Sequence, residues 1–402
     1  MSKDHRSVVR RGSGSGRLPK TGSRPVVTPI WPSVVYASAD ADALDAQYEG
    51  RAEGYTYGRE GHPNWTVLAE KLDWMEGAEG GAGAGVVTAS GMAAVAAVCQ
   101  AVLREGDHLV AGNQLYGRTL RLLRDELPRM GIEVTLADPT DGKAFAAAIR
   151  PETRLALVEV VSNPTLRVAD MEVIGAACRA AGVPLAVDNT FTTPRLYQPF
   201  RHGADFVIHS VTKMLGGHSD VTLGYAAACD PEIAGRLYDV VVTWGMTPSP
   251  FDCWLAERGL NSFDLRFDRA QANAAVLADH LAGQPGVEAV LYPGRPDHPD
   301  HNRAAGLLGG QGGTMVSFRL AGGRATVNRF LRAAEHIPFA PTLGDVATTL
   351  SHPASSSHRG LTEEGRTALG ITEGFIRVSV GIEEIGMLKD ELAAAIAASQ
   401  QG

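Results

Sequence analysis

Only six of the 37 basic residues in this 402-residue chain are lysines, and the other 31 are arginines. The lysines are Lys3, Lys20, Lys71, Lys143, Lys213 and Lys389. A guanidinium stays protonated and cannot form an imine with an aldehyde, whereas the amine of a lysine can. Because the chain has so few lysines, only six positions are candidates for an imine-forming residue.

Lys213 is the one lysine that follows a predicted buried strand. Two of the others lie in a polar N-terminal tail, two lie on predicted helices, and Lys143 lies in an Asp-Gly-Lys turn. The apolar segment Phe206–His209 ends shortly before Lys213, and the neighbours of this lysine are small or hydroxylic. A surface lysine in a loop is the alternative. Its position after a strand and the elimination of the others favour a covalent role.

Asp188 ends another apolar segment, Leu185-Ala186-Val187, 25 residues before Lys213. A carboxylate at that place can pair with a protonated pyridine nitrogen and keep the ring an electron sink, which is how pyridoxal phosphate stabilises carbanions. The alternative is an aspartate that caps a helix or a turn, which is common after strands. Together, Lys213 and Asp188 predict a pyridoxal-phosphate site.

The segment Ser90-Gly91-Met92 follows a predicted strand and opens a helix. Exposed amides at a helix N-terminus, with a glycine that permits close approach, bind phosphate. An ordinary serine N-cap explains the same pattern equally well. The hydroxyls of Ser210 and Thr212 can donate to the same phosphate.

Three further features concern aromatic, cationic and glycine residues. Tyr116 follows a predicted strand and can stack on a flat ring, although a core or surface tyrosine is the default. Arg377 is a charge among apolar neighbours, so we expect it to bind a carboxylate, either of a substrate or in a structural ion pair. The glycine-rich segment at 80–85 precedes its strand, which is the wrong context for a dinucleotide-binding motif, and we interpret it as a turn.

These residues lie between segments that alternate from apolar to amphipathic. The expected strands are Val86–Ala89, His108–Ala111, Glu133–Ala137, Leu155–Val161, Leu185–Asp188 and Phe206–His209, the last of which closes the series. The expected helices are Trp65–Met75, Met92–Leu103, Thr119–Arg129, Gly142–Ile149 and Met171–Ala181. Short apolar strands between amphipathic helices indicate a parallel sheet covered on both faces. Ligands of such sheets bind beyond the carboxyl ends of the strands, where the polar residues are expected.

The chain is too long for one small core, and its pattern changes after residue 258. We expect a disordered tail at 1–25, an irregular aromatic-rich arm at 26–61 and a large doubly wound α/β domain at 62–258. A smaller α+β domain is expected at 259–402. Its elements are a helix at Phe267–Ala282 and strands at Val287–Tyr292, Thr314–Leu320 and Phe375–Val380.

Composition excludes several classes of function. A formal charge of −8 argues against a nucleic-acid partner, and no apolar segment is long enough to span a membrane or to resemble a signal sequence. The histidines, including His298 and His301, lack metal-ligand spacing, so we expect no metal site. The four cysteines, Cys99, Cys178, Cys229 and Cys253, have no paired spacing and are interpreted as buried hydrophobic residues in a reducing cytoplasm.

From residue 28 to its C-terminus the chain resembles the Cys/Met-metabolism enzymes that depend on pyridoxal phosphate, the family of the cystathionine and methionine γ-lyases and cystathionine γ-synthase. The stretches that carry the resemblance are Tyr-Thr-Tyr-Gly-Arg (55–59), Ala-Ser-Gly-Met-Ala-Ala (89–94), Asn-Pro-Thr (163–165), Val-Asp-Asn-Thr-Phe (187–191), His-Ser-Val-Thr-Lys (209–213), Gly-His-Ser-Asp-Val (217–221), Ser-His-Pro-Ala-Ser (351–355) and Ile-Arg-Val-Ser-Val-Gly (376–381).

The resemblance implies a type I aminotransferase-like fold and a homotetramer built from active dimers. It implies that Lys213 binds the cofactor covalently and then shuttles protons, that Asp188 pairs with the ring nitrogen, and that Tyr116 stacks on the ring and helps to deprotonate the substrate amine. The implied phosphate ligands are Gly91, Met92, Ser210 and Thr212, joined by Tyr57 and Arg59, which reach into the site of the neighbouring subunit. The implied ligands of the substrate carboxylate are Asn163 and Arg377, with Thr342 near them.

Several positions depart from the family pattern. Arg118 stands where methionine γ-lyases carry a cysteine, Pro341 where cystathionine γ-lyases carry a glutamate, and Thr342 where a serine is usual. His62-Pro63-Asn64-Trp65 stands where Asn-Pro-Thr usually follows Tyr-x-Arg. The expected function is a carbon–sulfur lyase that removes a γ or β substituent from a small-molecule substrate, a sulfur-containing or activated amino acid, to give a 2-oxo acid, ammonia and a thiol. A γ-replacement synthase and a non-catalytic binding protein are the alternatives.

Overall fold

A computed structural model of the chain describes residues 22–78 and 85–401. Its main feature is a seven-stranded sheet with the strand order β1-β7-β6-β5-β4-β2-β3. The neighbours from β6 to β3 are parallel, and β7 is antiparallel to β1 and to β6. The carboxyl ends of β2, β4, β5 and β6 therefore meet at one edge of the sheet.

The sheet alternates with helices along the chain, as expected for a doubly wound α/β region. Its strands are β1 (Val86–Thr88), β2 (His108–Gly112), β3 (Glu133–Ala137), β4 (Thr153–Glu159), β5 (Leu185–Asp188), β6 (Phe206–His209) and β7 (Gly224–Ala228). The helices of this region are α3 (Pro63–Glu76), α4 (Gly91–Val102), α5 (Gly117–Arg121), α6 (Gly142–Ala147), α7 (Met171–Ala181), α8 (Thr193–Leu196), α9 (Pro231–Thr243) and α10 (Pro250–Leu260).

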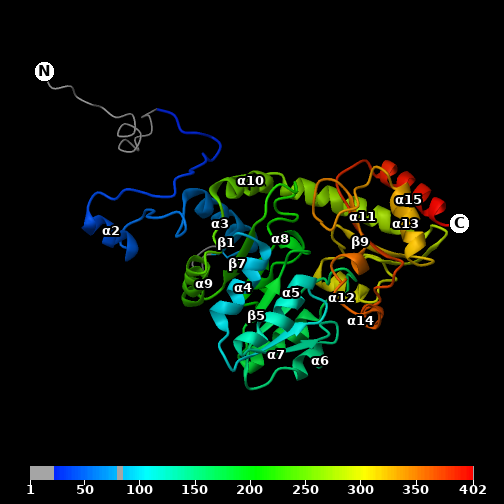
Figure 1. Ribbon diagram of the computed structural model, residues 1–402, viewed down its shortest axis with the longest axis horizontal. Helices are drawn as coiled ribbons and strands as arrows, with labels where there is room; N and C mark the ends of the chain where they lie inside the picture. Colours follow the sequence, from blue (N-terminus) through cyan, green and yellow to red (C-terminus); the bar gives the residue numbers. More distant parts are fainter. Residues whose placement is uncertain (1–21, 79–84, 402) are drawn as a thin grey trace.

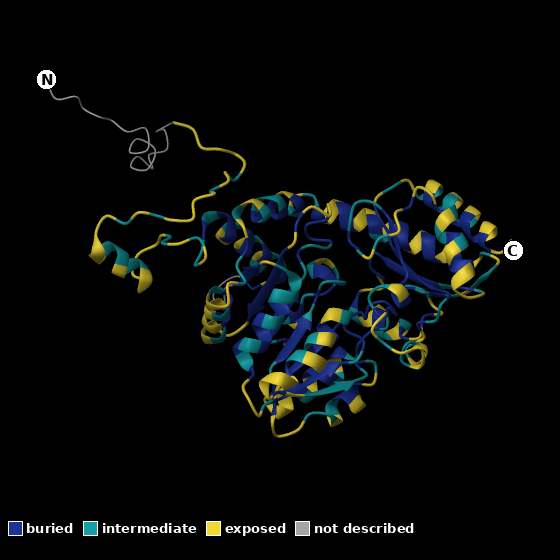
Figure 2. Ribbon diagram, in the orientation of Figure 1, coloured by how far each residue is buried: buried dark blue, intermediate teal, exposed yellow. Residues whose placement is uncertain are grey.

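The core of this region forms between the sheet and its helices. Strands β2, β6 and β7 are buried along their whole length, and the helices turn only one face inward (Figure 2). In α4, for example, Ala94, Val98 and Ala101 are buried at helical spacing against the sheet. Burial on both faces accounts for the continuous apolar strands of the sequence.

A second, antiparallel sheet with its own core follows the first in the chain (Figure 1). Its order is β10-β11-β9-β8, with β8 (Val287–Leu291), β9 (Met315–Leu320), β10 (Thr349–Ser351) and β11 (Phe375–Ser379). The helices of this region are α11 (Phe263–Ala282), α12 (His301–Leu307), α13 (Arg324–Ala333), α14 (Glu363–Ala368) and α15 (Ile385–Ser399). The predicted boundary at residues 258 and 259 falls inside α10, and this division into domains stays a prediction.

The described part of the N-terminal arm extends away from the body of the protein (Figure 1). It contains one helix, α2 (Ala41–Tyr48), and its apolar side chains Val27, Val35 and Tyr48 are exposed. Where it meets the body, Trp254 Nε1 donates to the carbonyl of Thr28 at 2.8 Å. An arm that projects from the body and exposes apolar side chains is suited to packing on another surface.

The structure corrects some expectations about individual elements. Phe206–His209 is not the last strand of the large sheet, because β7 follows it in the chain and pairs with it. The sequence of β7, Gly-Tyr-Ala-Ala-Ala, lacks the β-branched residues that are typical of strands. The expected helix Thr119–Arg129 is the short α5, followed by a π-helical turn (Leu122–Glu126) and a 3₁₀ turn (Pro128–Met130). The arm contains a helix where only irregular chain was expected.

Other corrections concern single residues, and two expectations cannot be compared with the structure. Cys229 is exposed, whereas the other three cysteines are buried as expected. Lys143 lies in the first turn of α6, whose N-cap is Asp141, and so is helical. The tail up to residue 21 and the glycine-rich segment up to residue 84 lie outside the described residues.

Candidate active site

A cavity of about 870 Å³ opens at the carboxyl ends of the parallel strands. It brings together ten of the twelve residues singled out from the sequence and the family resemblance: Gly91, Met92, Tyr116, Asn163, Asp188, Ser210, Thr212, Lys213, Thr342 and Arg377. Eight of them come from the region of the large sheet, and Thr342 and Arg377 come from the region of the second sheet. The cavity therefore lies where the two regions meet.

Lys213 lies in the turn that follows β6 and projects into this cavity. Its amine makes no hydrogen bond or ion pair with any residue that the structure describes. Burial, and next the positive charge of Arg377, lower the pKa of the Lys213 amine below its usual value. A larger fraction of the amine is therefore neutral near pH 7, and the neutral amine is the form that attacks an aldehyde.

Two carboxyl groups, of the buried Glu159 and the partly buried Asp188, lie side by side at the edge of the sheet. Asp188 and Glu159 are partners in the parallel register of β5 and β4. Burial raises the pKa of both, and the charge of Asp188 raises the pKa of Glu159 further. The backbone N–H and hydroxyl of Thr190 donate to Oδ1 of Asp188 at 3.1 and 2.6 Å and lower its pKa in part. Asp188 is thus the better placed of the two to stay ionised beside a cationic ring.

The amino end of α4 forms another wall of the cavity. The Ser90 hydroxyl caps this helix by accepting from the N–H of Ala93 at 3.1 Å, so the N-cap interpretation is confirmed. A Cβ at position 91 would lie 2.7 Å from the Cβ of Ser210, so Gly91 permits a close approach that a larger residue would prevent. The hydroxyl of Thr212 donates to the carbonyl of Leu223 at 3.1 Å. The hydroxyl of Ser210 has no hydrogen-bond partner among the described residues and is free for a ligand.

Arg377 projects from β11 into the opposite wall. It donates to Oδ1 of Asn163 at 2.7 Å and to the carbonyl of Thr342 at 2.8 Å. Its Nε has no hydrogen-bond partner, and none of the described acidic residues forms an ion pair with it. Burial lowers the pKa of the guanidinium to about 10, which leaves it protonated at neutral pH. A buried cation without an anion is suited to bind a carboxylate from a ligand.

Tyr116 stands at the mouth of the cavity, and 41% of its surface is exposed. Its backbone N–H donates to Oε1 of Glu159 at 2.7 Å, which fixes the turn at the start of α5. The other carboxylate oxygen of Glu159 has no partner among the described residues. The exposed ring is free to cover a flat ligand.

Tyr57 and Arg59 do not line this cavity in their own chain. The Arg59 guanidinium lies over the ring of Tyr57, 5.6 Å from its centre, and donates to the carbonyl of Val242 at 3.1 Å. Both residues belong to the arm. Their predicted role in a neighbouring subunit stays a prediction.

The structure adds residues to which the sequence assigned no role. Glu159 and Thr190 were visible as polar residues at strand ends, but their contacts with Tyr116 and Asp188 depend on the fold. The loop from Ser355 to Leu361 also lines the cavity. A Cβ at Gly117 would lie 2.0 Å from the carbonyl oxygen of Ser357, so this loop packs directly on the start of α5.

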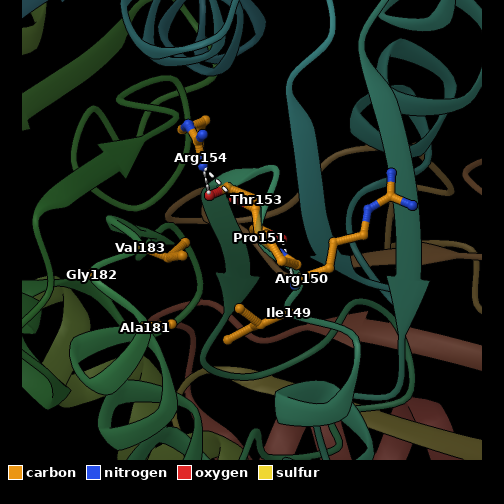
Figure 3. A pocket seen from close by; sticks show the side chains of 8 residues that line it. All are labelled: Ile149, Arg150, Pro151, Thr153, Arg154, Ala181, Gly182 and Val183. Carbon is orange, nitrogen blue, oxygen red and sulfur yellow. Dashed lines mark hydrogen bonds between the residues drawn. The ribbon is translucent and has the colours of Figure 1, made fainter.

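A second cavity, of about 430 Å³, lies at the opposite edge of the large sheet (Figure 3). It is lined by Arg150, Arg154 and the end of α7, and it contains none of the predicted site residues. Across residues 22–78 and 85–401, no group of three or more His, Cys, Asp or Glu side chains is placed to hold a metal ion. No helix in that part of the chain is long and apolar enough to cross a membrane.

The carboxyl-end cavity fits pyridoxal phosphate. This cofactor needs an amine for its aldehyde, an acid for its ring nitrogen and donors for its phosphate. Lys213 has an unpaired amine, Asp188 accepts hydrogen bonds at one oxygen only, and Gly91 and Ser210 leave space beside the amino end of α4. The three requirements are met within one cavity.

Comparisons with known proteins show which family the chain belongs to. The sequence pattern of the Cys/Met metabolism PLP-dependent enzymes matches residues 12–397. An L-methionine γ-lyase of Porphyromonas gingivalis is 36% identical over 90% of each chain. An O-succinylhomoserine sulfhydrylase of Pseudomonas aeruginosa is 38% identical over 91% of this chain and 89% of that protein.

Solved structures show the same fold. The crystal structure of cystathionine γ-synthase from Xanthomonas oryzae pv. oryzae, in complex with aminoacrylate and cysteine, superposes with a TM-score of 0.87. It is 36% identical in sequence and covers 93% of this chain and 94% of its own. Sequence and fold agree over nearly the whole length, and the chain therefore belongs to the Cys/Met metabolism family of pyridoxal-phosphate-dependent enzymes.

Proposed function

We propose that this enzyme is a carbon–sulfur lyase of the cystathionine γ-lyase type. It removes a γ or β substituent from a sulfur-containing or activated amino acid and yields a 2-oxo acid, ammonia and a thiol. The observation that carries the proposal is the pairing, in one cavity, of the Lys213 amine with Arg377, a buried cation that lacks an anionic partner. A base beside a carboxylate site is the arrangement needed to deprotonate the α-carbon of an amino acid.

The residues of the cavity divide the work of binding between them. Asn163 and Arg377 bind the α-carboxylate of the substrate, with Thr342 beside them. Asp188 accepts the ring N–H of the cofactor. Gly91 and Met92 offer backbone amides to the phosphate, to which Ser210 and Thr212 add hydroxyls.

Proton transfer falls to two residues. Pyridoxal phosphate, when bound, supplies an electron-withdrawing ring that stabilises negative charge at the α-carbon of the substrate. Tyr116 covers the ring and helps to deprotonate the substrate amine. Lys213 would hold the cofactor through its aldehyde, and its amine, when free, would take the α-proton of the substrate. The same amine returns protons at later steps, when the leaving group departs.

The proposal includes a homotetramer made of active dimers in the cytoplasm. Exposed apolar side chains on the arm, among them Val27, Val35 and Tyr48, support an interface with a second copy of the chain. Tyr57 and Arg59 lie on this arm, outside the cavity of their own chain, and would complete the phosphate site of the partner. The four free cysteines fit a reducing compartment.

A γ-replacement synthase is the second candidate. The sulfhydrylase of P. aeruginosa and the cystathionine γ-synthase of X. oryzae support it, because both are as similar to this chain as the lyase is. Arg118 and Pro341 stand where methionine γ-lyases carry a cysteine and cystathionine γ-lyases a glutamate, and these changes also fit a substrate other than that of either lyase. The third possibility, a non-catalytic protein, does not fit a member of a family of enzymes.

A panel of substrates separates the candidates. The purified protein with pyridoxal phosphate is given methionine, homocysteine, cystathionine and O-acyl homoserines, with and without an added thiol. A lyase releases 2-oxo acid and ammonia from a sulfur-containing substrate without the thiol. Formation of a thioether only when an O-acyl homoserine and a thiol are both present would show a synthase instead.

A further inference from the structure

A buried carboxylate lies behind the candidate site and has none of the roles described above. Glu76 is the last residue of α3, and only 1% of its surface is exposed. The C-terminal end of a helix carries partial negative charge, so a buried anion there is unfavourable unless it has partners. Asn189 Nδ2 donates to Oε1 of Glu76 at 2.9 Å, and His209 Nε2 contacts the same oxygen.

These two partners lie next to residues of the site. Asn189 directly follows Asp188 at the end of β5, and His209 ends β6 directly before Ser210. Both are as deeply buried as Glu76, with 0% and 1% of their surfaces exposed. Glu76 therefore joins the ends of two adjacent strands, each of which continues into a residue that faces the cavity.

A second link joins the same strand ends on the cavity side. The backbone N–H of Ser210 donates to the hydroxyl oxygen of Thr190 at 2.8 Å. That hydroxyl donates to Oδ1 of Asp188 at 2.6 Å. The separation between Asp188 and Ser210 is thus held from the cavity by Thr190 and from the core by Glu76.

The buried contact between Glu76 and His209 lowers the stability of the folded state. Oε2 of Glu76 and Nδ1 of His209 have no hydrogen-bond partner in the part of the chain that the structure describes. A buried polar atom left unpaired destabilises the folded state, and an apolar pair of the same shape would avoid that cost. A role other than stability accounts for its presence.

We propose that Glu76 is a positioning residue for the cofactor, which fixes the separation between Asp188 and Ser210 by holding Asn189 and His209. The inference rests on the proposed roles of Asp188 at the ring nitrogen and of Ser210 at the phosphate. Pyridoxal phosphate contacts both, so an error in their separation costs affinity. Burial raises the pKa of Asp188, and a positive charge on His209 would lower it in part, which would favour the ionised form beside a cationic ring.

Binding of two cofactor forms to the apoprotein tests this role. Glu76→Asp keeps the charge and shortens the reach, whereas Glu76→Gln keeps the reach and removes the charge. Dissociation constants are measured by visible absorbance for pyridoxal phosphate and for pyridoxal, which lacks the phosphate and does not span the two contacts. We expect Glu76→Asp to weaken pyridoxal phosphate about tenfold and pyridoxal by less than about twofold.

His108→Gln is the matched control. His108 is equally buried, with 0% exposed, and it bonds to Thr153 and Thr135 at the opposite edge of the same sheet. This variant should lower the thermal midpoint and leave both dissociation constants unchanged. Glu76→Gln should give a smaller loss than Glu76→Asp, because its side chain still reaches both partners.

Two results would overturn the proposal. One is a Glu76→Asp variant that weakens pyridoxal as much as pyridoxal phosphate or changes neither. The other is loss of the folded state in both Glu76 variants, because the proposal assigns this residue to spacing and leaves the fold to the rest of the core. The measurement involves no substrate, so its failure is distinct from a failure of the proposed lyase activity, which the product assay of the unmodified enzyme decides.

Discussion

Strands β4 and β5 run between two cavities that differ in how their charges are paired. At the amino end, Arg150 forms an ion pair with Glu133. Arg154 donates to the carbonyls of Pro151 and Thr153 (Figure 3). These side chains are largely exposed. At the carboxyl end, Glu159 and Arg377 are buried, and each has a polar atom without a partner.

This difference in charge pairing distinguishes an ordinary protein surface from a ligand-binding site. An exposed ion pair costs the fold little and contributes little, because water screens it. A buried group with an unmet hydrogen bond is costly, and where such a group lines a cavity, a ligand can supply the missing partner. The carboxyl end of the sheet is therefore the place where substitutions should change chemistry, and the amino end is the place where they should change only stability.

Replacing Lys213 should have the largest effect. Lys213→Ala removes the amine that we propose holds the cofactor and moves the α-proton, so kcat should fall by more than about 1,000-fold. Turnover is measured as 2-oxo acid release at saturating pyridoxal phosphate. Lys143→Ala, on the exposed first turn of α6, is the control and should keep full activity. A fully active Lys213→Ala enzyme would refute the assignment.

Replacing Arg377 should act mainly on substrate binding. Arg377→Lys keeps a positive charge but loses the planar fork that bonds Asn163 and Thr342, so KM should rise about tenfold or more. Steady-state kinetics on the best substrate of the panel measure it. Arg150→Lys in the other cavity should leave KM unchanged. An unchanged KM in Arg377→Lys would place the substrate carboxylate elsewhere.

Capture of the cofactor by Lys213 should depend on pH. Burial and Arg377 lower the pKa of Lys213, so the apoprotein should capture pyridoxal phosphate with a midpoint below the usual value of a lysine. The capture rate rises with pH, because the neutral amine is the reactive form. Arg377→Gln removes a positive charge that disfavours the ammonium, so the midpoint should move upward. Stopped-flow absorbance across pH measures it, and a midpoint that moves downward contradicts the sign.

The smallest effect is expected at the amino end. Arg150→Ala breaks an exposed ion pair with Glu133, so the free energy of unfolding should fall only slightly. Urea unfolding gives that value, and kcat and KM should stay the same. A large loss of activity without a loss of stability would show that this edge of the sheet takes part in the reaction.

Much of the site could be predicted from residue types and positions. Lys213 and Asp188 follow apolar segments long enough to be strands, and parallel strands bring their carboxyl ends to one edge. Arg377 and Thr342 are far away in the sequence, so only the family resemblance connected them with this edge. The contact between Glu159 and the amide of Tyr116 depends on how α5 begins, which residue periodicity does not reveal.

The weaker predictions of the fold have local causes. Strand β7 consists of small residues with little preference for strands, and its place between β1 and β6 is decided by pairing across the sheet. The segment after Thr119 has helical periodicity, but the chain there widens into a π-helical turn. The role proposed for Tyr57 and Arg59 lies in a neighbouring subunit, so the contacts within one chain do not reveal it.

Trapping the bound cofactor tests the central claim most directly. The purified protein is mixed with pyridoxal phosphate, reduced with borohydride, digested and mapped by mass spectrometry. We expect one modified lysine, Lys213, and a visible absorbance band before reduction. A protein that stays colourless, or an adduct on any of the other five lysines, would contradict the assignment of the site.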